Sequence, residues 1–165
     1  MSSQGGEAGK APGGMRPPGL SMKKIKLGLV VSKFNWSITS KMEIAARGQA
    51  KKRGAEIAAV SYSPGCCDSP YAAMQMLKAK KVDAIVVLGV LLHGKTKHDE
   101  VVAISAFGAL QQLSIMYGKP VGFGIIGPGA TKKIAHERAE DYAVRSVDAA
   151  IDLASGDVSR PREHR

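Results

Sequence analysis

The stretch VLGVLLHGKTKHDEVV at residues 87–102 combines residue types that could bind an anion and move a proton. An apolar run ends at Leu92, the polar turn Gly94-Lys95-Thr96 breaks it, and a helical pattern begins at His98. The free N–H groups and the dipole of a helix start favour an anion such as a phosphate. An imidazole within a turn of that anion could transfer protons at neutral pH. The stretch therefore predicts a phosphate site beside a proton carrier.

Residues 89–96 also fit the nucleotide-binding pattern G-x-x-x-x-G-K-[ST], with a strand before and a helix after. The four intervening residues, VLLH, are bulky where a loop around a phosphate chain usually carries small ones. The chain also offers no second apolar strand that ends in an aspartate for magnesium. Three interpretations stay open from these residues alone: a small phosphate compound, a nucleotide, and an ordinary strand-to-helix connection with a solvated lysine.

Composition narrows the class of protein. The chain has 165 residues, of which 44% are hydrophobic, enough for one domain with a sizeable core. Its two cysteines, Cys66 and Cys67, are adjacent and make no disulfide framework, which favours a reducing compartment. No apolar run approaches the roughly 20 residues of a membrane span, and no apolar segment follows the first methionine. We therefore expect a cytoplasmic protein with no membrane partner.

The net charge of +10 is compatible with nucleic acid, an acidic surface or small anionic substrates. The basic residues are scattered in short runs near expected helix ends and in the C-terminal tail, and the few aromatic residues do not alternate with them. A surface that binds single strands needs such aromatics for stacking. The charge pattern therefore favours small anionic substrates, and we expect no nucleic acid partner.

The chain divides into three segments. Residues 1–22 are rich in Gly, Pro, Ser and Met without periodicity, which predicts a disordered leader. Residues 23–155 are expected to form a single folded domain, and residues 156–165 a polar basic tail.

Apolar runs alternate with helical patterns through the folded segment. Strands are expected at 26–32, 55–61, 83–92 and 121–126, and helices at 37–53, 70–80, 98–117 and 131–153, with a loop at 127–130. Ser40 and Glu43 could form a capping box, Gly54 could end the first helix, and Ser69 could cap the second. The third helix is expected to bury Val102, Ala106, Ala109, Leu113 and Met116. This order predicts an α/β fold with three layers, in which helices cover both faces of a four-stranded parallel sheet.

Ligands of such sheets bind at the carboxyl ends of the strands, a rule that groups the loops at 34–35, 64–68, 94–98 and 127–131. Phe34 could stack on a flat heterocycle or be a buried core ring. Asp68 could accept hydrogen bonds from a ligand or cap the next helix. Cys66 and Cys67 read as packing residues and do not make a structural zinc site. Arg138 would suit a phosphate if its helix start faced one.

Taken together, the loops resemble those of the lumazine synthase family, and most of all its archaeal branch. The matching pieces, in family order across about residues 25–153, are Phe34-Asn35 with Ile38-Thr39; Pro64-Gly65 with Asp68 and Pro70; Leu88-Gly89 with Gly94, Thr96 and His98-Asp99-Glu100; Lys119-Pro120-Val121; Gly127-Pro128-Gly129 with Thr131; and Glu137-Arg138. A single motif of this kind would be weak, whereas all of them in register make the resemblance specific.

The resemblance implies a flavodoxin-like fold and a homo-pentamer, or an icosahedral shell of pentamers, with active sites between neighbouring subunits. It implies that Phe34 stacks on a pyrimidine ring, that Cys66, Cys67 and Asp68 line the ribityl and pyrimidine pocket, and that Val90, Leu91, Leu92 and His93 supply backbone contacts. Lys95 and Thr96 would bind phosphate and His98 would transfer protons. Phe123 and Arg138 would come from the adjacent subunit, with Arg138 holding the phosphate.

The implied activity is that of a transferase in riboflavin biosynthesis. It condenses two small molecules, 5-amino-6-(D-ribitylamino)uracil and 3,4-dihydroxy-2-butanone 4-phosphate, to 6,7-dimethyl-8-ribityllumazine with release of phosphate and water. No metal or organic cofactor is implied. An archaeal-type riboflavin synthase and a non-catalytic shell-forming relative remain alternatives beside the nucleotide-binding protein.

Three residues depart from the family pattern. Lys95 stands where archaeal relatives usually carry an acid, Cys67 where an aromatic is expected, and Ile134 where the family usually has a glutamine. Lys95 adds positive charge at the expected phosphate turn, so we expect it to tighten phosphate binding.

Overall fold

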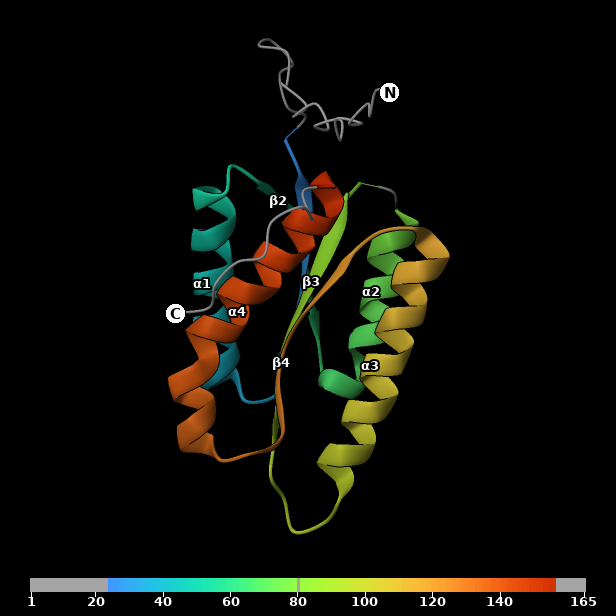
Figure 1. The fold of residues 1–165 in the computed structure, drawn as a ribbon. Helices are drawn as coiled ribbons and strands as arrows, with labels where there is room; N and C mark the ends of the chain where they lie inside the picture. Colours follow the sequence, from blue (N-terminus) through green and yellow to red (C-terminus); the bar gives the residue numbers. More distant parts are fainter. Residues whose placement is uncertain (1–23, 80, 157–165) are drawn as a thin grey trace, which may run out of the picture.

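The computed structural model describes residues 24–79 and 81–156. The predicted leader and nearly all of the predicted tail lie outside these residues. In chain order the elements are β1 (Lys26–Ser32), α1 (Trp36–Lys52), β2 (Glu56–Ser63), the short 3₁₀ helix η1 (Cys66–Asp68), α2 (Ser69–Lys78), β3 (Ala84–Leu92), α3 (His98–Tyr117), β4 (Val121–Ala130) and α4 (Lys132–Ser155). Each predicted strand and helix is present (Figure 1).

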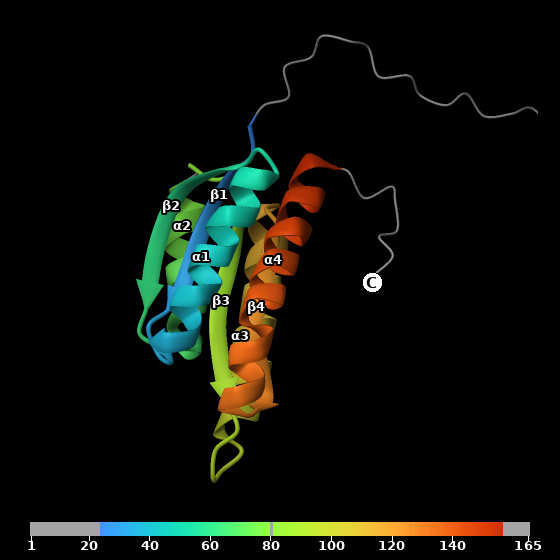
Figure 2. The same cartoon turned by 90° about the vertical axis from the view of Figure 1, so that its left-hand side faces the viewer.

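The strands form one parallel sheet in the order β2-β1-β3-β4. Helices α1 and α4 cover one face, and α2 and α3 cover the other (Figures 1 and 2). The carboxyl ends of all strands meet at one edge, where the loop after β3 projects farthest from the sheet (Figure 2). The predicted three-layer α/β fold is confirmed, and no helix within 24–79 and 81–156 is long and apolar enough to cross a membrane.

Burial on both faces explains why the central strands are continuously apolar. Leu27, Leu29 and Val31 of β1 pack toward α1 and α4, whereas Val30 packs toward α2 and α3. Every residue of β3 from Ala84 to Val90 is buried. Each buried aliphatic side chain contributes about 1.5–3 kcal/mol relative to an exposed one. The sheet is therefore the rigid support from which the carboxyl-edge loops extend.

Helix α4 lies very close to β4 because small residues face each other there. A Cβ atom added at Gly122 would collide with the backbone carbonyl of Ser146. Ala139, Ala143 and Ala150 of α4 are buried in the same core. The close approach fixes the position of α4 relative to the end of β4.

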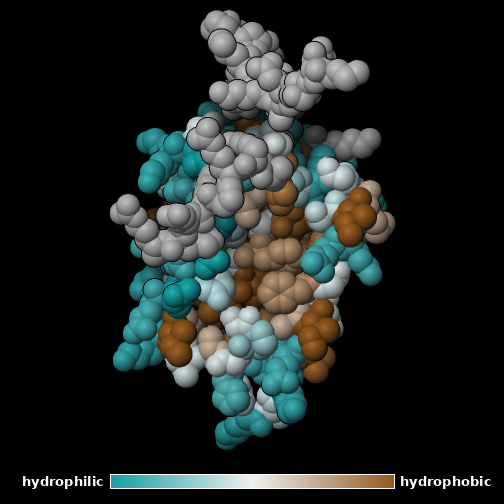
Figure 3. Space-filling model, viewed as in Figure 1, coloured by the Kyte–Doolittle hydropathy of each residue, from teal (hydrophilic) through white to brown (hydrophobic). Residues whose placement is uncertain are grey.

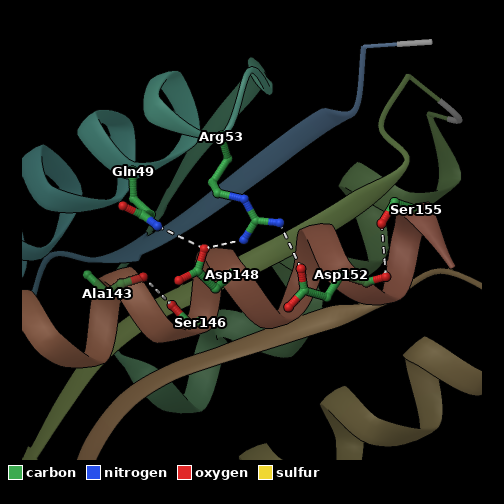
Figure 4. Close-up of polar contacts among 7 residues, drawn as sticks. All are labelled: Gln49, Arg53, Ala143, Ser146, Asp148, Asp152 and Ser155. Carbon is green, nitrogen blue, oxygen red and sulfur yellow. Dashed lines mark hydrogen bonds and ion pairs between the residues drawn. The ribbon is translucent and has the colours of Figure 1, made fainter. Parts of the chain in front are cut away.

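Arg53, just past the end of α1, clamps α1 to α4. Its guanidinium donates to Asp148 and, at 2.7 Å, to Asp152, and Gln49 also donates to Asp148 at 2.8 Å (Figure 4). Burial by itself lowers the pKa of Arg53, but the hydrogen bonds and charges of Asp152 and Asp148 outweigh it and raise that pKa above its ordinary value. The clamp joins two helices that lie far apart in sequence.

The predicted capping residues were only partly right. Helix α1 begins at Trp36 after Asn35, so Ser40 and Glu43 lie inside the helix and form no capping box. The Glu43 carboxylate instead accepts hydrogen bonds from Arg47 and from the hydroxyl of Tyr62. Gly54 does follow the end of α1, with φ +71°.

The second helix starts one residue earlier than predicted. Ser69 is its first residue and not its cap. The Ser69 hydroxyl is buried and hydrogen-bonds with the Ser63 hydroxyl at 3.0 Å and the Gly65 carbonyl at 3.2 Å. It therefore ties the end of β2 to the start of α2.

Two further predictions were wrong. The loop expected at 127–130 is the end of β4, where Ala130 pairs with Leu92 after an irregularity in the register. Met116, expected in the core of α3, is 76% exposed, and its neighbour Ile115 is 81% exposed. Apolar side chains also gather over β4 between α3 and α4, on the face shown in Figure 3. These apolar side chains are exposed on the surface and lie outside the hydrophobic core.

Candidate functional site

A pocket of about 590 Å³ lies at the carboxyl edge of the sheet. Its lining comes from the loop after β1, from η1 and the residue before it, from the end of β3 and the turn that follows, and from the first turns of α3. It consists of Phe34, Asn35, Gly65, Cys66, Cys67, Val90, Leu91, Leu92, Gly94, Thr96, His98, Asp99 and Val102. Eight residues predicted for the site are among them: Phe34, Cys66, Cys67, Val90, Leu91, Leu92, Thr96 and His98. The carboxyl edge of the sheet, which the strand order predicted as the ligand-binding edge, therefore carries a concave surface.

The loop after β1 presents Phe34 at the pocket. The backbone N–H of Phe34 donates to the Pro64 carbonyl at 3.1 Å, which ties this loop to the one after β2. The Phe34 side chain is 69% exposed, so the ring is not part of the core. An exposed ring held by a fixed backbone is suited to stack on a flat ligand.

Asn35 is a pocket residue that the sequence reasoning treated only as part of a motif. It has φ +60°, a left-handed conformation that asparagine tolerates better than most residues. Its side-chain amide donates to the Val90 carbonyl at 3.4 Å. The sequence feature that could have identified it is an asparagine next to an aromatic residue just after a predicted strand.

The loop after β2 contributes two cysteines in different environments. The Cys66 thiol is buried and faces the Val90 carbonyl at 3.9 Å. Burial raises the pKa of Cys66, so the neutral thiol is favoured. Cys67 is exposed at the pocket. The Asp68 carboxylate accepts a hydrogen bond from the Gly65 N–H at 2.9 Å and does not line the pocket.

The end of β3 forms one wall of the pocket. Val90 is buried, and Leu91 and Leu92 are half-buried. Gly89, the first glycine of the nucleotide-like pattern, lies inside this strand, and a Cβ there would collide with the Cys66 sulfur. It is therefore a packing glycine, because four residues of the pattern belong to the strand and cannot wrap a phosphate chain.

The start of α3 supplies the polar end of the pocket. Gly94, Lys95 and Lys97 are exposed in the connecting turn, and Thr96 and His98 line the pocket. Lys95 is not among the lining residues. The free N–H groups at this helix start favour an anion beside the His98 imidazole.

Asp99 is a second residue that the sequence reasoning did not assign to the site. It lines the pocket, is only 7% exposed, and accepts a hydrogen bond from the Gly129 N–H at 2.9 Å. An acidic residue in the first turn of a helix is ordinarily exposed to solvent and stabilises the helix dipole. Nothing in the sequence indicates that Asp99 is buried.

Besides Asp68 and Lys95, two more predicted residues, Arg138 and Phe123, lie outside this pocket. Arg138 lines a separate hollow of about 440 Å³ beside the end of β4. Its guanidinium lies 5.7 Å from the centre of the Tyr142 ring and pairs with Asp141 at 3.1 Å. Phe123 is half-buried on β4 and packs on Phe107, with 5.2 Å between ring centres. Within the described part of this chain, neither side chain lines the pocket that contains His98.

The layered parallel sheet and the pocket at its carboxyl edge define a flavodoxin-like α/β protein. The family model described as 6,7-dimethyl-8-ribityllumazine synthase matches residues 24–156. The chain belongs to this family, as its loops predicted.

Curated relatives agree with the family assignment. The chain is 50% identical over 132 residues to the 6,7-dimethyl-8-ribityllumazine synthase of Aeropyrum pernix, an alignment that covers 79% of this chain and 90% of that protein. It is 47% identical to that of Archaeoglobus fulgidus, over 80% of this chain and 92% of the relative. For Staphylothermus marinus the identity is 49%, over 78% and 85% of the two chains. The family and the strand position of Gly89 together exclude the nucleotide-binding interpretation.

Proposed function

We propose that this chain is an active 6,7-dimethyl-8-ribityllumazine synthase of riboflavin biosynthesis, and that its substrates meet in the carboxyl-edge pocket. The observation that carries the proposal is that one pocket joins the exposed Phe34 ring, the end of β3 and the helix start at His98. A flat ring system, a polyol and a phosphate each find a suitable surface there, in a chain that belongs to this family.

The pyrimidine substrate is assigned to the end of the pocket nearest the sheet. Phe34 stacks on its ring, and the backbone of residues 90–93 makes the polar contacts. Cys66 and Cys67 line the ribityl side, and Asp68 accepts hydrogen bonds if its carboxylate turns from Gly65 toward the ligand. The half-buried leucines of β3 exclude water from the apolar face of the ring.

The phosphate substrate is assigned to the start of α3. Thr96 offers a hydroxyl and its N–H group, and Lys95 adds charge from the exposed turn. His98, which lines the pocket, is assigned to move protons between the amine, the carbonyl and the leaving group. The amine attacks the ketone and forms an imine with loss of one water, phosphate leaves, and the ring closes with loss of a second water. Much of the acceleration comes from holding two substrates together.

Assembly completes the site in this proposal. Phe123 and Arg138 lie outside the pocket of their own subunit, which supports their assignment to the pocket of a neighbour. The exposed Ile115 and Met116 of α3 and the apolar surface over β4 offer area for subunit contacts (Figure 3). We assign a homo-pentamer, either free or assembled with others into an icosahedral shell.

A turnover assay tests the proposal. The purified chain is mixed with the aminouracil and the butanone phosphate, and formation of the fluorescent lumazine is followed. We expect His98→Ala to lower turnover by about 100-fold and Arg138→Ala to raise the KM for the phosphate substrate by about tenfold or more. His136→Ala and Arg145→Ala on α4 are the matched controls and should behave as wild type.

The outcomes separate the alternatives. A wild-type rate no greater than the uncatalysed background refutes the proposed function and favours a non-catalytic relative. Lumazine consumption with riboflavin formation would identify a riboflavin synthase instead. A fast wild type with an equally fast His98→Ala variant refutes the assignment of His98.

A further inference from the structure

We infer that Asp99 is a positioning residue that holds together the two parts of the reaction machinery on one subunit, the His98 pocket and the Arg138 hollow. The inference rests on the proposed function and extends it to a residue that neither the sequence motifs nor the family assignment gave a role.

Asp99 lies in the wall between the two hollows. On one side it lines the pocket that contains His98. Its Oδ2 accepts the N–H of Gly129 at 2.9 Å, and Gly129 lines the other hollow together with Arg138. The hydrogen bond thus crosses from the first turn of α3 to the end of β4.

The end of β4 that Asp99 contacts is irregular in register and rich in glycine. Gly127 and Gly129 have φ +96° and +81°, which most other residues do not adopt. Glycines lose the most conformational entropy on ordering, so such a segment needs specific bonds to stay in one conformation. The segment also leads directly into α4, whose second turn carries Arg138. A displaced Gly129 would therefore shift the approach to that arginine.

The two acids at the start of α3 perform different tasks. Glu100 is exposed and complements the helix dipole in solvent. Asp99 is buried and does not cap α3, whose capping position is Lys97. A buried carboxylate that accepts an N–H forms one of the stronger hydrogen bonds in proteins. Its burial is explained by the contact with β4 and not by stabilisation of its own helix.

The experiment compares three variants of the full chain. Asp99→Ala removes the acceptor, Asp99→Asn keeps an acceptor oxygen without the charge, and Glu56→Ala removes a carboxylate from the opposite edge of the sheet as the control. Turnover gives kcat and KM for each substrate. Hydrogen–deuterium exchange of peptides that cover residues 121–131 reports the end of β4 directly, with residues 26–32 of β1 as the internal reference.

We expect Asp99→Ala to lower kcat/KM by about tenfold to 100-fold, in the range of one hydrogen bond to a charged group. Exchange at residues 127–130 should rise by about tenfold or more while β1 is unchanged. Asp99→Asn should restore kcat/KM to within about threefold of wild type, and Glu56→Ala should match wild type. A general loss of stability would not give this rescue, and it would raise exchange in β1 as well.

Unchanged exchange at residues 127–130 in Asp99→Ala overturns the inference, and so does an Asp99→Asn variant as impaired as Asp99→Ala. If wild type forms no product, the proposed function fails by that result alone. The exchange experiment then still decides whether Asp99 holds the end of β4, because it does not depend on turnover.

Discussion

Gly89 gives the sharpest stability prediction, because a single atom of another side chain occupies the space beside it. The position lies in the buried strand β3, and an added methyl group would collide with the Cys66 sulfur. Cys66 cannot move aside easily, since its thiol is buried against the Val90 carbonyl. Gly89→Ala should therefore destabilise the chain although alanine is small and apolar.

The size of the effect follows from overpacking. Forcing an extra carbon into a close-packed core costs about 1–3 kcal/mol. Cys66→Ala removes the sulfur and should cost about 1 kcal/mol, the transfer and cavity terms of one heavy atom. In the double variant the new methyl group occupies the space that the sulfur left, so the loss should equal that of Cys66→Ala alone. The coupling between the two sites is then about 1–3 kcal/mol in favour of the double variant.

Urea unfolding of the four proteins by far-ultraviolet circular dichroism measures this cycle. All samples need the same protein concentration, because assembly contributes to apparent stability. The fluorescence of the single tryptophan, Trp36, provides a second probe of the same transition. A double variant whose destabilisation equals the sum of the two single losses would refute the reasoning.

Three further outcomes are expected. Arg53→Ala should lower the free energy of unfolding by about 2–4 kcal/mol, because it removes two charge-assisted hydrogen bonds between α1 and partly buried carboxylates on α4; urea unfolding measures it, and Arg145→Ala, an exposed arginine on α4, should change it little. Iodoacetamide at pH 8 should label Cys67 well before Cys66, because burial raises the pKa of Cys66 and the thiolate is the reactive form; peptide mass spectrometry distinguishes the two, and equal labelling would contradict it. Lys95→Glu should weaken inhibition by inorganic phosphate by about threefold or more, since it reverses a charge near the helix start, and unchanged inhibition would show that Lys95 does not act on the phosphate.

Most of the fold was predictable because the spacing of the apolar residues matches the buried faces and because Gly and Pro mark most of the element ends. The third helix was placed at residues 98–117 as observed, with Gly118 in a left-handed conformation after it. The end of β4 was missed because Gly and Pro ordinarily indicate a turn, whereas here the chain stays paired with β3 up to Ala130. Met116 was misplaced because an apolar residue at helical spacing looks the same whether it faces the core or an exposed surface.

The sequence indicated the site residues that directly follow the strand ends, but it did not indicate contacts between residues far apart in the chain. Strand order alone indicates that Phe34, Thr96 and His98 gather at one edge, because carboxyl ends of parallel strands meet there. The bond from Asp99 to Gly129 joins residues far apart in sequence, so no local pattern indicates it. The position of Arg138 in a separate hollow is likewise a property of how α4 packs on β4.

Two of the crowded glycines, Gly89 and Gly122, differ in whether a second substitution could make room for a side chain. The obstacle beside Gly89 is a side chain, so a lineage that first replaced Cys66 with a smaller residue could later accept alanine at position 89, whereas the reverse order passes through an unstable intermediate. The obstacle beside Gly122 is the backbone of α4 at Ser146, which no second substitution removes. Alanine at position 89 is therefore accessible only after a substitution at position 66. Alanine at position 122 is excluded for as long as α4 keeps its place against β4.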